Sequence, residues 1–325
     1  MVNFVTIEKS LLHGLMKLAG LRTQMVEIEP GTTMKFWAPF ETTKKEKAKV
    51  DPEEEEEKNQ KKKKKAKKPA VVLLHGFAAE GLMTWQFQVG PLLKKYAVYV
   101  PDLLFFGGSM TSKTDRSPEF QAECLVKGLT KLGVDTCTVV GFSYGGMVAF
   151  KMAELHQHMV KSLVVSGSVS AYTESMSRKV TGRLGFSSSS EMLLPTSVEG
   201  VKTLLNLGMY KNFRLPHRFY KDYFQVMFNN RKEKAELLET LVVSSSSSKD
   251  STIPNLSQRI HLLWGENDQI FNMEIAQSLK EQLGDKATLQ SIKKGGHLVH
   301  LERPCIYNRR LKAILASLHT DAAQQ

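Results

Sequence analysis

The sequence predicts an α/β domain in which helices cover both faces of a mostly parallel central sheet, with a helical cap inserted into it. Short runs rich in β-branched residues recur along the chain without polar alternation, as expected of strands that are buried on both faces. Helix-like stretches separate these runs, and such alternation is typical of a parallel sheet. The alternation stops near residue 170 and resumes near residue 256, which predicts the insertion.

The strand candidates of the core lie on both sides of the insertion. They are residues 70–74, 97–100, 136–140 and 162–165 before it, and residues 259–264 and 287–292 after it. One intervening helix should begin at Ser117 and Pro118, because serine caps helices and proline suits their first position. Two further strands should meet at Pro30 and Gly31, a pair typical of hairpins.

These features divide the chain into five predicted segments. They are an N-terminal helix with the first strands of the core (1–42), a charged disordered loop (43–69), the first part of the core (70–170), the helical cap (171–255) and the second part of the core (256–325).

Of the formal net charge of +12, +5 lies in the charged loop and +7 in the rest of the chain. Residues 44–68 contain twelve lysines and seven acidic residues, which gives +5 in that stretch alone. A segment of this composition cannot bury apolar surface, so we expect a solvated loop and no nucleic-acid partner. An alternative is that the lysines of residues 61–68 direct nuclear import.

Cysteine usage and hydropathy predict a cytoplasmic protein. Cys124, Cys137 and Cys305 are too few and too widely spaced for a disulfide framework or a zinc site, so we expect all three to be packing residues. The first twenty residues lack the unbroken apolar core of a signal peptide. No later run reaches the ~20 apolar residues that a membrane-spanning helix needs.

The N-terminal segment carries apolar residues at helical spacing, namely Ile7, Leu11, Leu15 and Leu18. Such a row is typical of a helix that docks on its own domain, and this is the expected arrangement. Peripheral membrane contact through the same helix is the alternative. Both arrangements are compatible with a monomer or a homodimer.

The strand at 136–140 leads directly into Gly141-Phe142-Ser143-Tyr144-Gly145 and then into an apolar helix. This is the G-x-S-x-G pattern, in which a strained strand-to-helix turn holds a serine hydroxyl above the edge of the sheet. The strand before it and the helix after it make the match specific. Ser143 is therefore the predicted nucleophile.

A serine hydroxyl needs a base within hydrogen-bond reach and an acid that orients that base. After later strands of the core we expect the acid first and the histidine second. Asp268 follows the strand at 259–264, and His297 follows the strand at 287–292. The predicted triad is Ser143, His297 and Asp268.

Two neighbouring side chains are alternatives to this assignment. Glu266 lies in the same loop as Asp268, but Asp268 is deeper in the loop and is preferred. His300 follows His297 by one helical turn and lies away from the preceding glycines, so we expect a structural role for it. Asp268 could also act only as the cap of a helix that begins near Met273.

Acyl transfer further requires donors aimed at the oxyanion that forms when the carbonyl is attacked. The backbone amide of Tyr144, directly after the nucleophile, is one candidate. The loop His75-Gly76-Phe77 after the first core strand supplies the other, and we assign the amide of Phe77. His75 is expected to support this loop.

The predicted cap is rich in methionine and aromatic side chains, which can line an acyl pocket, although packing is the preferred role for most of them. They are Met176, Met192, Met209, Met227, Phe186, Phe213, Phe219, Phe224, Phe228, Tyr210, Tyr220 and Tyr223.

Several motifs stand together in one order along the chain. They are His75-Gly76-Phe77, Pro101-Asp102-Leu103, Phe106-Gly107-Gly108-Ser109, the elbow at Ser143, Trp264-Gly265, Gly296-His297 and Glu302-Arg303-Pro304. In this order they resemble the α/β-hydrolase superfamily from residue 70 to the C-terminus, apart from the cap. The resemblance implies the α/β-hydrolase fold. Within the superfamily, the chain is similar to a plant group of 2-hydroxy-6-oxohepta-2,4-dienoate hydrolase-like or monoacylglycerol lipase-like proteins.

The chain departs from some members of this superfamily. The ring-cleavage-product hydrolases that it resembles have a tryptophan beside the catalytic histidine and an asparagine near the oxyanion loop, whereas this chain has Leu298 at the first position and Trp85, Gln86 and Gln88 in the second region. Epoxide hydrolases of this fold carry aspartate where this chain has Ser143. The sequence therefore predicts a carboxylesterase or lipase-like serine hydrolase for an apolar or aromatic acyl ester, without a metal or cofactor.

Two other functions remain open at this stage. One is hydrolysis of a carbon–carbon bond in a 2-hydroxy-6-oxo-dienoate. The other is a small-molecule receptor on the same fold that does not turn its ligand over.

Overall fold

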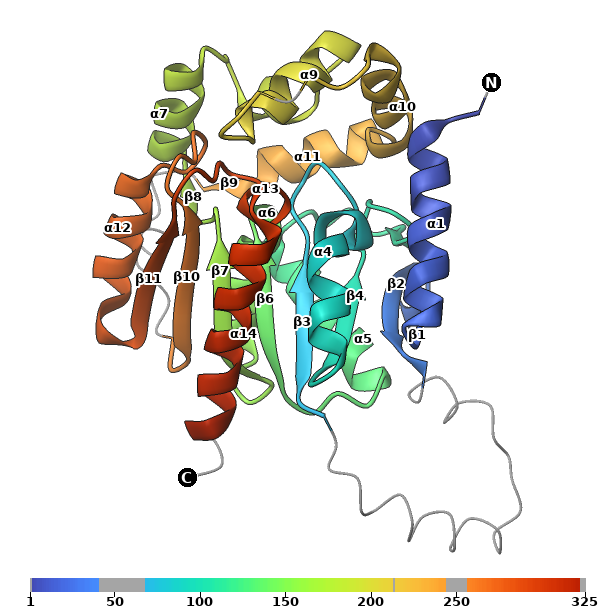
Figure 1. The fold of residues 1–325 in the computed structure, drawn as a ribbon, viewed down its shortest axis with the longest axis vertical. Helices are drawn as coiled ribbons and strands as arrows, with labels where there is room; N and C mark the ends of the chain where they lie inside the picture. The colour runs from blue at the N-terminus through green and yellow to red at the C-terminus, as the bar shows by residue number, and fades with distance from the viewer. Residues whose placement is uncertain (1, 41–67, 213, 244–255, 322–325) are drawn as a thin grey trace, which may run out of the picture.

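The computed structural model describes residues 2–40, 68–212, 214–243 and 256–321, and Figure 1 shows its architecture. Helices flank a central sheet on both sides, and a layer of further helices lies over one end of it. The predicted charged loop at 43–69 falls outside the described residues, except for its last two positions. No helix in the described ranges is both long and apolar enough to cross a membrane.

The chain enters the sheet through a helix and a hairpin and then alternates between strands and helices. The elements up to the insertion are α1 (Phe4–Leu18), β1 (Leu21–Glu29), β2 (Thr32–Pro39), β3 (Ala70–Leu74), α4 (Gly81–Leu93), β4 (Ala97–Pro101), β5 (Met110–Thr111), α5 (Pro118–Lys131), β6 (Cys137–Phe142), α6 (Tyr144–Leu155) and β7 (Val160–Ser166).

The insertion forms a small two-stranded sheet and the helices over the end of the main sheet. Its elements are β8 (Tyr172–Thr173), α7 (Glu174–Leu184), α8 (Ser189–Leu193), α9 (Val198–Leu207), α10 (His217–Met227), α11 (Arg231–Leu241) and β9 (Val242–Val243). The pairing of β8 with β9 brings the two ends of the insertion together. We call the part of the chain from Tyr172 to Val243 the cap.

The rest of the core follows the cap. Its elements are β10 (Arg259–Gly265), α12 (Met273–Leu283), a short 3₁₀ helix (Gly284–Lys286), β11 (Ala287–Ile292), α13 (Val299–Glu302) and α14 (Pro304–Asp321). Arg303 separates the last two helices.

The main sheet has the order β1-β2-β4-β3-β6-β7-β10-β11, with β5 paired to β2. Strand β2 pairs antiparallel with β1, β4 and β5. The remaining pairs of this sheet, in the order β4-β3-β6-β7-β10-β11, are all parallel. The predicted mostly parallel sheet is confirmed. Since parallel strands end at the same edge, the loops after β3, β6, β10 and β11 all lie beneath the cap.

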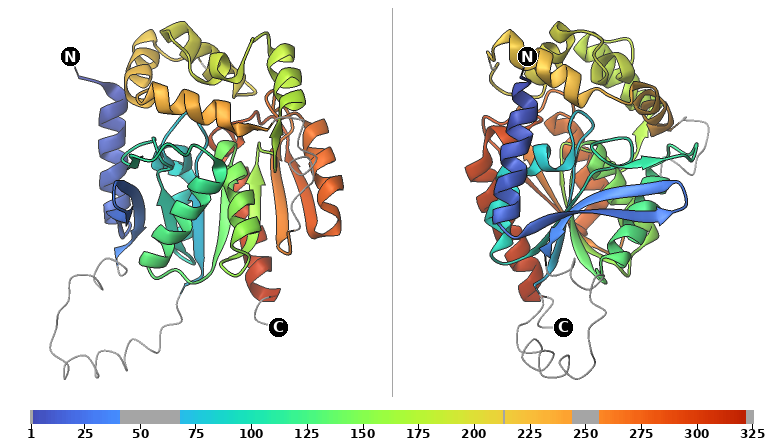
Figure 2. Two further views of the ribbon diagram at one scale, coloured as in Figure 1. Left: turned by 180° about the vertical axis from the view of Figure 1, so that it is seen from behind. Right: turned by 90° about the vertical axis from the view of Figure 1, so that its right-hand side faces the viewer.

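Helices cover both faces of this sheet, as predicted. Figures 1 and 2 show α4 and α14 on one face and α5 and α6 on the other. Helix α5 begins where the sequence indicated, because the hydroxyl of Ser117 accepts a hydrogen bond from the amide of Phe120 at 3.1 Å. Cys124 and Cys137 are buried in the core, but Cys305 is exposed, so the packing role predicted for Cys305 is wrong.

Helix α1 docks on the domain through a different face from the one we expected. Val5, Leu12 and Met16 are its buried residues. The predicted docking residues point to solvent instead, and their exposed fractions are 41% for Ile7, 66% for Leu11, 57% for Leu15 and 87% for Leu18. The helical spacing identified an apolar row, but it could not indicate that the helix carries a second apolar face.

Candidate active site

The register of the parallel strands brings the predicted site loops to one edge of the sheet. Gly141 on β6 pairs with Leu74 on β3, so the turn at Ser143 lies beside the loop that follows β3. Gly265 on β10 pairs with Ile292 on β11, so the loops that carry Asp268 and His297 are also neighbours. Residues that lie far apart in the sequence are thereby collected under the cap.

Ser143 occupies a strained turn between β6 and α6. Its φ is +51° and its ψ is −122°, a backbone conformation that L-residues other than glycine rarely adopt. The turn is tight because small residues surround it. A Cβ atom at Gly141 would lie 2.7 Å from the carbonyl oxygen of Gly145, and a Cβ at Gly145 would collide with the carbonyl oxygen of His75.

Asp268 and His297 are joined by a hydrogen bond of 2.8 Å between Nδ1 and Oδ2. The other oxygen of Asp268, Oδ1, accepts from the amides of Ile270 and Phe271 at 2.8 and 2.9 Å. The carboxyl is buried, with an exposed fraction of 4%. Because an ionised carboxylate accepts the proton on Nδ1, Nε2 is the ring atom left to act as a base.

The alternatives for the acid are distinguished by their positions. Glu266, in the same loop, is exposed and is not joined to His297. The N-cap residue of helix α12 is Asn272, whose side chain accepts a hydrogen bond from the amide of Ile275 at 3.2 Å. Asp268 is therefore not needed to cap this helix.

The two other histidines near the site are buried supports. His75 donates from Nδ1 to the carbonyl of Gly76 at 2.7 Å, and its Nε2 accepts from the amide of Leu103 at 2.9 Å. His300 is fully buried in α13, and its ring centroid lies 4.4 Å from that of Phe142 and 5.0 Å from that of Trp85. Neither ring nitrogen of His300 has a hydrogen-bond partner among the described residues.

These buried histidines predict a loss of stability in acid. Burial lowers the pKa of His300 to about 3 and that of His75 to about 4. In the unfolded chain both titrate near pH 6.5, so below that pH the unfolded state binds protons that the folded state does not. The free energy of unfolding should therefore fall by about 2 kcal/mol per histidine between pH 7.5 and pH 5.

The His300 contribution can be measured with His300→Phe, which keeps a ring in the apolar site and cannot be protonated. Urea unfolding at both pH values should show about 2 kcal/mol less acid destabilisation in this variant than in the wild type. The exposed His158→Phe serves as the matched control. An identical pH dependence in His300→Phe and the wild type would contradict the prediction.

Ser143 and His297 line one small pocket between the core and the cap, with a volume of about 30 Å³. The pocket residues are Phe77, Ser143, Tyr144, Met147, Tyr172, Ser189, Met192, Leu193, Leu238, Leu241, Ile270, Phe271 and His297. The predicted oxyanion residues Phe77 and Tyr144 are both among them. Within the described residues, neither of their backbone amides donates a hydrogen bond, so both are available to a ligand.

The cap reaches this pocket through helices α8 and α11. Of the cap residues singled out in the sequence, only Met192 is among the described residues that line it, and Phe213 lies outside the described residues. Aromatic residues of α10 pack with one another instead. For example, the rings of Phe219 and Tyr223 stack with centroids 6.0 Å apart. The sequence did not single out Leu238 and Leu241, because apolar type alone does not distinguish a residue facing the pocket from one facing a neighbouring helix.

Glu302 has a role that the sequence reasoning missed. Its carboxylate accepts from the amide of Gly296 at 2.8 Å, directly before His297. The same carboxylate accepts from the amides of Tyr210 and Lys211 in the cap, both at 3.0 Å. Glu302 therefore ties the histidine loop to the cap. Its motif with Arg303 and Pro304 was visible in the sequence, but the partners of the carboxylate were not.

No group of three or more histidine, cysteine, aspartate or glutamate side chains in the described ranges is arranged to hold a metal ion.

Known proteins share this fold and parts of this sequence. Residues 69–183 match the family model described as alpha/beta hydrolase fold. Mouse epoxide hydrolase 4 is 25% identical over 269 residues, which is 76% of this chain and 73% of that protein. Lipase 3 from Moraxella sp. strain TA144 is 25% identical over 213 residues, which is 65% of this chain and 66% of that protein.

A solved structure extends the likeness over almost the whole chain. The 2-hydroxy-6-oxo-6-phenylhexa-2,4-dienoate hydrolase from Rhodococcus sp. strain RHA1 superimposes with a TM-score of 0.68 at 18% identity. The match covers 92% of this chain and 99% of that one. The sheet order, the turn at Ser143, the matched family model and this superposition agree, and the chain has the α/β-hydrolase fold.

Proposed function

We propose that this protein is a serine hydrolase that cleaves esters with an apolar or aromatic acyl group through Ser143, His297 and Asp268. The observation that carries the proposal is the hydrogen bond from His297 to Asp268, because His297 lines the same pocket as Ser143. A hydroxyl, an imidazole and a carboxylate in this arrangement are what acyl transfer by a serine requires.

In the proposed reaction, the oxygen of Ser143 attacks the ester carbonyl while Nε2 of His297 takes the hydroxyl proton. Asp268 holds the ring through Nδ1 and stabilises the imidazolium that forms. The amides of Phe77 and Tyr144 donate to the oxyanion. His297 then gives its proton to the leaving alcohol, and water hydrolyses the acyl-enzyme by the same steps with His297 again as the base.

The pocket lining supports an apolar acyl group. Met147, Leu238, Ile270 and Phe271 contribute hydrocarbon, thioether and aromatic surface, and no lysine or arginine is among the described residues that line the pocket. A dienoate substrate carries a carboxylate that would leave its charge without a cationic partner here. The same absence of charge suits a neutral ester.

The pocket volume of about 30 Å³ has room for water but not for an acyl chain, so substrate binding requires side chains of the cap to move.

The similarity to an epoxide hydrolase does not extend to the chemistry that Ser143 can perform. Opening an epoxide with a carboxylate gives an ester, which water can then hydrolyse. Opening it with a serine hydroxyl would give an ether, which has no carbonyl for water to attack. A serine at the nucleophile position therefore favours acyl substrates.

The proposal is tested by labelling with a fluorophosphonate probe, followed by intact-mass and peptide mass spectrometry. We expect one adduct per chain, located on Ser143, and no adduct in Ser143→Ala. Ser189→Ala is a matched control, because Ser189 is a second serine in the lining of the same pocket, and this variant should still be labelled. An adduct on Ser189, or labelling of Ser143→Ala at the wild-type rate, would overturn the assignment of the nucleophile.

The substrate class is tested by comparing kcat/KM for p-nitrophenyl esters of increasing acyl length with that for a 2-hydroxy-6-oxo-dienoate. We expect multiple turnovers of the esters and at least about 100-fold lower kcat/KM for the dienoate, equivalent to roughly 3 kcal/mol in transition-state binding. A faster reaction with the dienoate would favour carbon–carbon bond hydrolysis. A single burst of p-nitrophenol release without further turnover would favour the alternative that the protein is a small-molecule receptor.

A further inference from the structure

The outward side of α1 carries a continuous row of exposed apolar residues, which we call the N-terminal stripe. Its members and their exposed fractions are Phe4 (58%), Ile7 (41%), Leu11 (66%), Leu15 (57%) and Leu18 (87%). With 3.6 residues per turn, these positions fall within an arc of about 80° on the helix. Single exposed apolar residues are ordinary, but a contiguous row of them marks an interaction surface.

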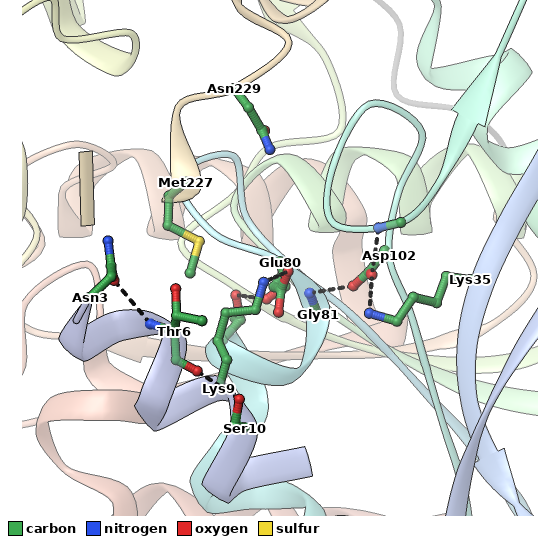
Figure 3. A network of polar contacts seen from close by, with 12 residues as sticks. Asn3, Thr6, Lys9, Ser10, Lys35, Glu80, Gly81, Asp102, Met227 and Asn229 are labelled. Atoms are coloured by element: carbon green, nitrogen blue, oxygen red, sulfur yellow. Dashed lines mark hydrogen bonds and ion pairs between the residues drawn. The ribbon is translucent and has the colours of Figure 1, made fainter. Parts of the chain in front are cut away.

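The helix is held so that the stripe stays outward. Its buried face, Val5 with Leu12 and Met16, packs on the domain. On the side shown in Figure 3, the ammonium of Lys9 reaches the buried carboxylate of Glu80 at 2.7 Å. The stripe therefore cannot turn inward without breaking a half-buried ion pair and exposing a packed face.

The start of α1 is attached to the cap. The amide of Phe4 donates to Oδ2 of Asp222 on α10 at 2.8 Å, and Asp222 is almost fully buried. The side chain of Asn3 caps the helix by accepting from the amide of Thr6 at 3.0 Å. The right-hand view of Figure 2 looks directly onto α1, which runs from the hairpin β1–β2 to the cap with no described element in front of it. The stripe is a fixed, open surface.

Positive charge gathers at the C-terminal end of the stripe. Arg22 donates to the carbonyl of Lys17 and lies over the ring of Phe40, 5.0 Å from its centroid. The amide of Phe40 donates to the carbonyl of Gly20 at 3.0 Å, so the last described residue before position 41 also lies beside this end of the helix. The sequence then continues into residues 44–68, with a net charge of +5, in a chain whose total is +12.

We propose that the N-terminal stripe docks the protein on the surface of an anionic lipid bilayer. Apolar side chains on one face of a helix enter the boundary between headgroups and acyl chains, while basic residues beside them are attracted to anionic headgroups. The helix lies along the surface, because its 15 residues are too few to cross the hydrocarbon core. This docking is independent of the proposed ester hydrolysis, since it uses none of the residues assigned to that reaction.

A second copy of this chain fits the stripe less well. Five side chains of this kind expose on the order of 100 Å² each, or roughly 500 Å² together, whereas a stable interface covers about 800 Å² on each partner. Two copies facing each other through the stripe would also bring their basic ends together or leave them unpaired.

Co-sedimentation with lipid vesicles tests the proposal on the full chain. The probes are vesicles of phosphatidylcholine alone and of phosphatidylcholine mixed with phosphatidylserine. We expect the wild type to bind the mixed vesicles, to bind the neutral ones less, and to bind less as salt is raised. The double variant Leu11→Glu with Leu15→Glu should lose at least about 10-fold in binding to the mixed vesicles.

Met110→Glu with Leu155→Glu is the matched control. It changes the charge equally, and it replaces exposed apolar residues on β5 and α6, outside the stripe. It should bind as the wild type does. Leu18→Ser, at the most exposed stripe position, provides a second variant that leaves the helix interior intact and should weaken binding in the same direction.

Three outcomes would overturn the proposal. They are a wild type that does not bind the mixed vesicles, equal binding to neutral vesicles, and a stripe variant that binds as the control does. Light scattering tests the alternative that a second copy covers the stripe. A wild type that is dimeric and a stripe variant that is monomeric would favour this alternative. Ester turnover by the stripe variant in solution separates a failure of docking from a failure of the proposed catalysis.

Discussion

Replacing Ser143 with alanine should lower kcat for the best ester substrate by about 10⁴- to 10⁶-fold. The hydroxyl is the proposed attacking group, and the backbone amides of Phe77 and Tyr144 cannot form an acyl-enzyme in its place. What remains should be the slow reaction of water assisted by the oxyanion donors. The substitution removes one oxygen and adds no atoms, so binding should change little. The measurement is kcat and KM under steady-state conditions.

The control for this prediction is Ser189→Ala, which removes a hydroxyl from the same pocket. The hydroxyl of Ser189 contacts those of Tyr172 and Ser177 at 3.3 and 3.2 Å, and its loss should change kcat by less than about 10-fold. Urea unfolding of both variants checks that the fold is intact. Turnover by Ser143→Ala within about 10-fold of the wild type would rule out Ser143 as the nucleophile.

Asp268→Asn should lower kcat by about 10⁴-fold with little change in KM. The carboxylate accepts the proton on Nδ1 of His297, which leaves Nε2 unprotonated and able to act as a base. An asparagine amide that donates to Nδ1 would stabilise the opposite tautomer, in which Nε2 carries the proton and cannot accept one from Ser143. The carbonyl of asparagine can still accept from the amides of Ile270 and Phe271, so the loop should keep its shape.

Glu266→Gln is the matched control, because it makes the same chemical change two residues away in the same loop. Glu266 is exposed, and we expect its loss to change kcat by less than about threefold. If Glu266→Gln were the damaging variant and Asp268→Asn the mild one, the acid would have to be reassigned. Steady-state kinetics of the two variants on one ester, with the wild type alongside, decides between them.

The core strands were predictable because their burial leaves a direct mark on the sequence. Ala70–Leu74 and the runs near residues 139 and 163 are apolar on both sides of the strand, which only a sheet covered on both faces requires. The turn at Ser143 was predictable for a similar reason, since glycines must stand where strand and helix pass closely. In both cases the local geometry restricts the residue types, so the pattern can be read in one short stretch.

The pocket was not predictable in the same way. Met192, Leu238 and Leu241 reach it from the cap, while many equally apolar residues of the cap pack elsewhere. Glu302 accepts hydrogen bonds from two separate loops. Contacts of this kind depend on how helices are placed relative to one another, and apolar character or charge alone does not encode that placement.

The succession of strands and helices, the sharp turn at Ser143 and a short list of acids and histidines that could serve it can all be read from the sequence. It takes the packed structure to show that Asp268, not Glu266, contacts His297, that His300 is buried behind the site, and that the apolar row of α1 faces outward. The physical reason is that periodicity and local spacing record what a residue is and how its own segment folds. Which surface covers a residue is set by the register of distant strands and the packing of distant helices.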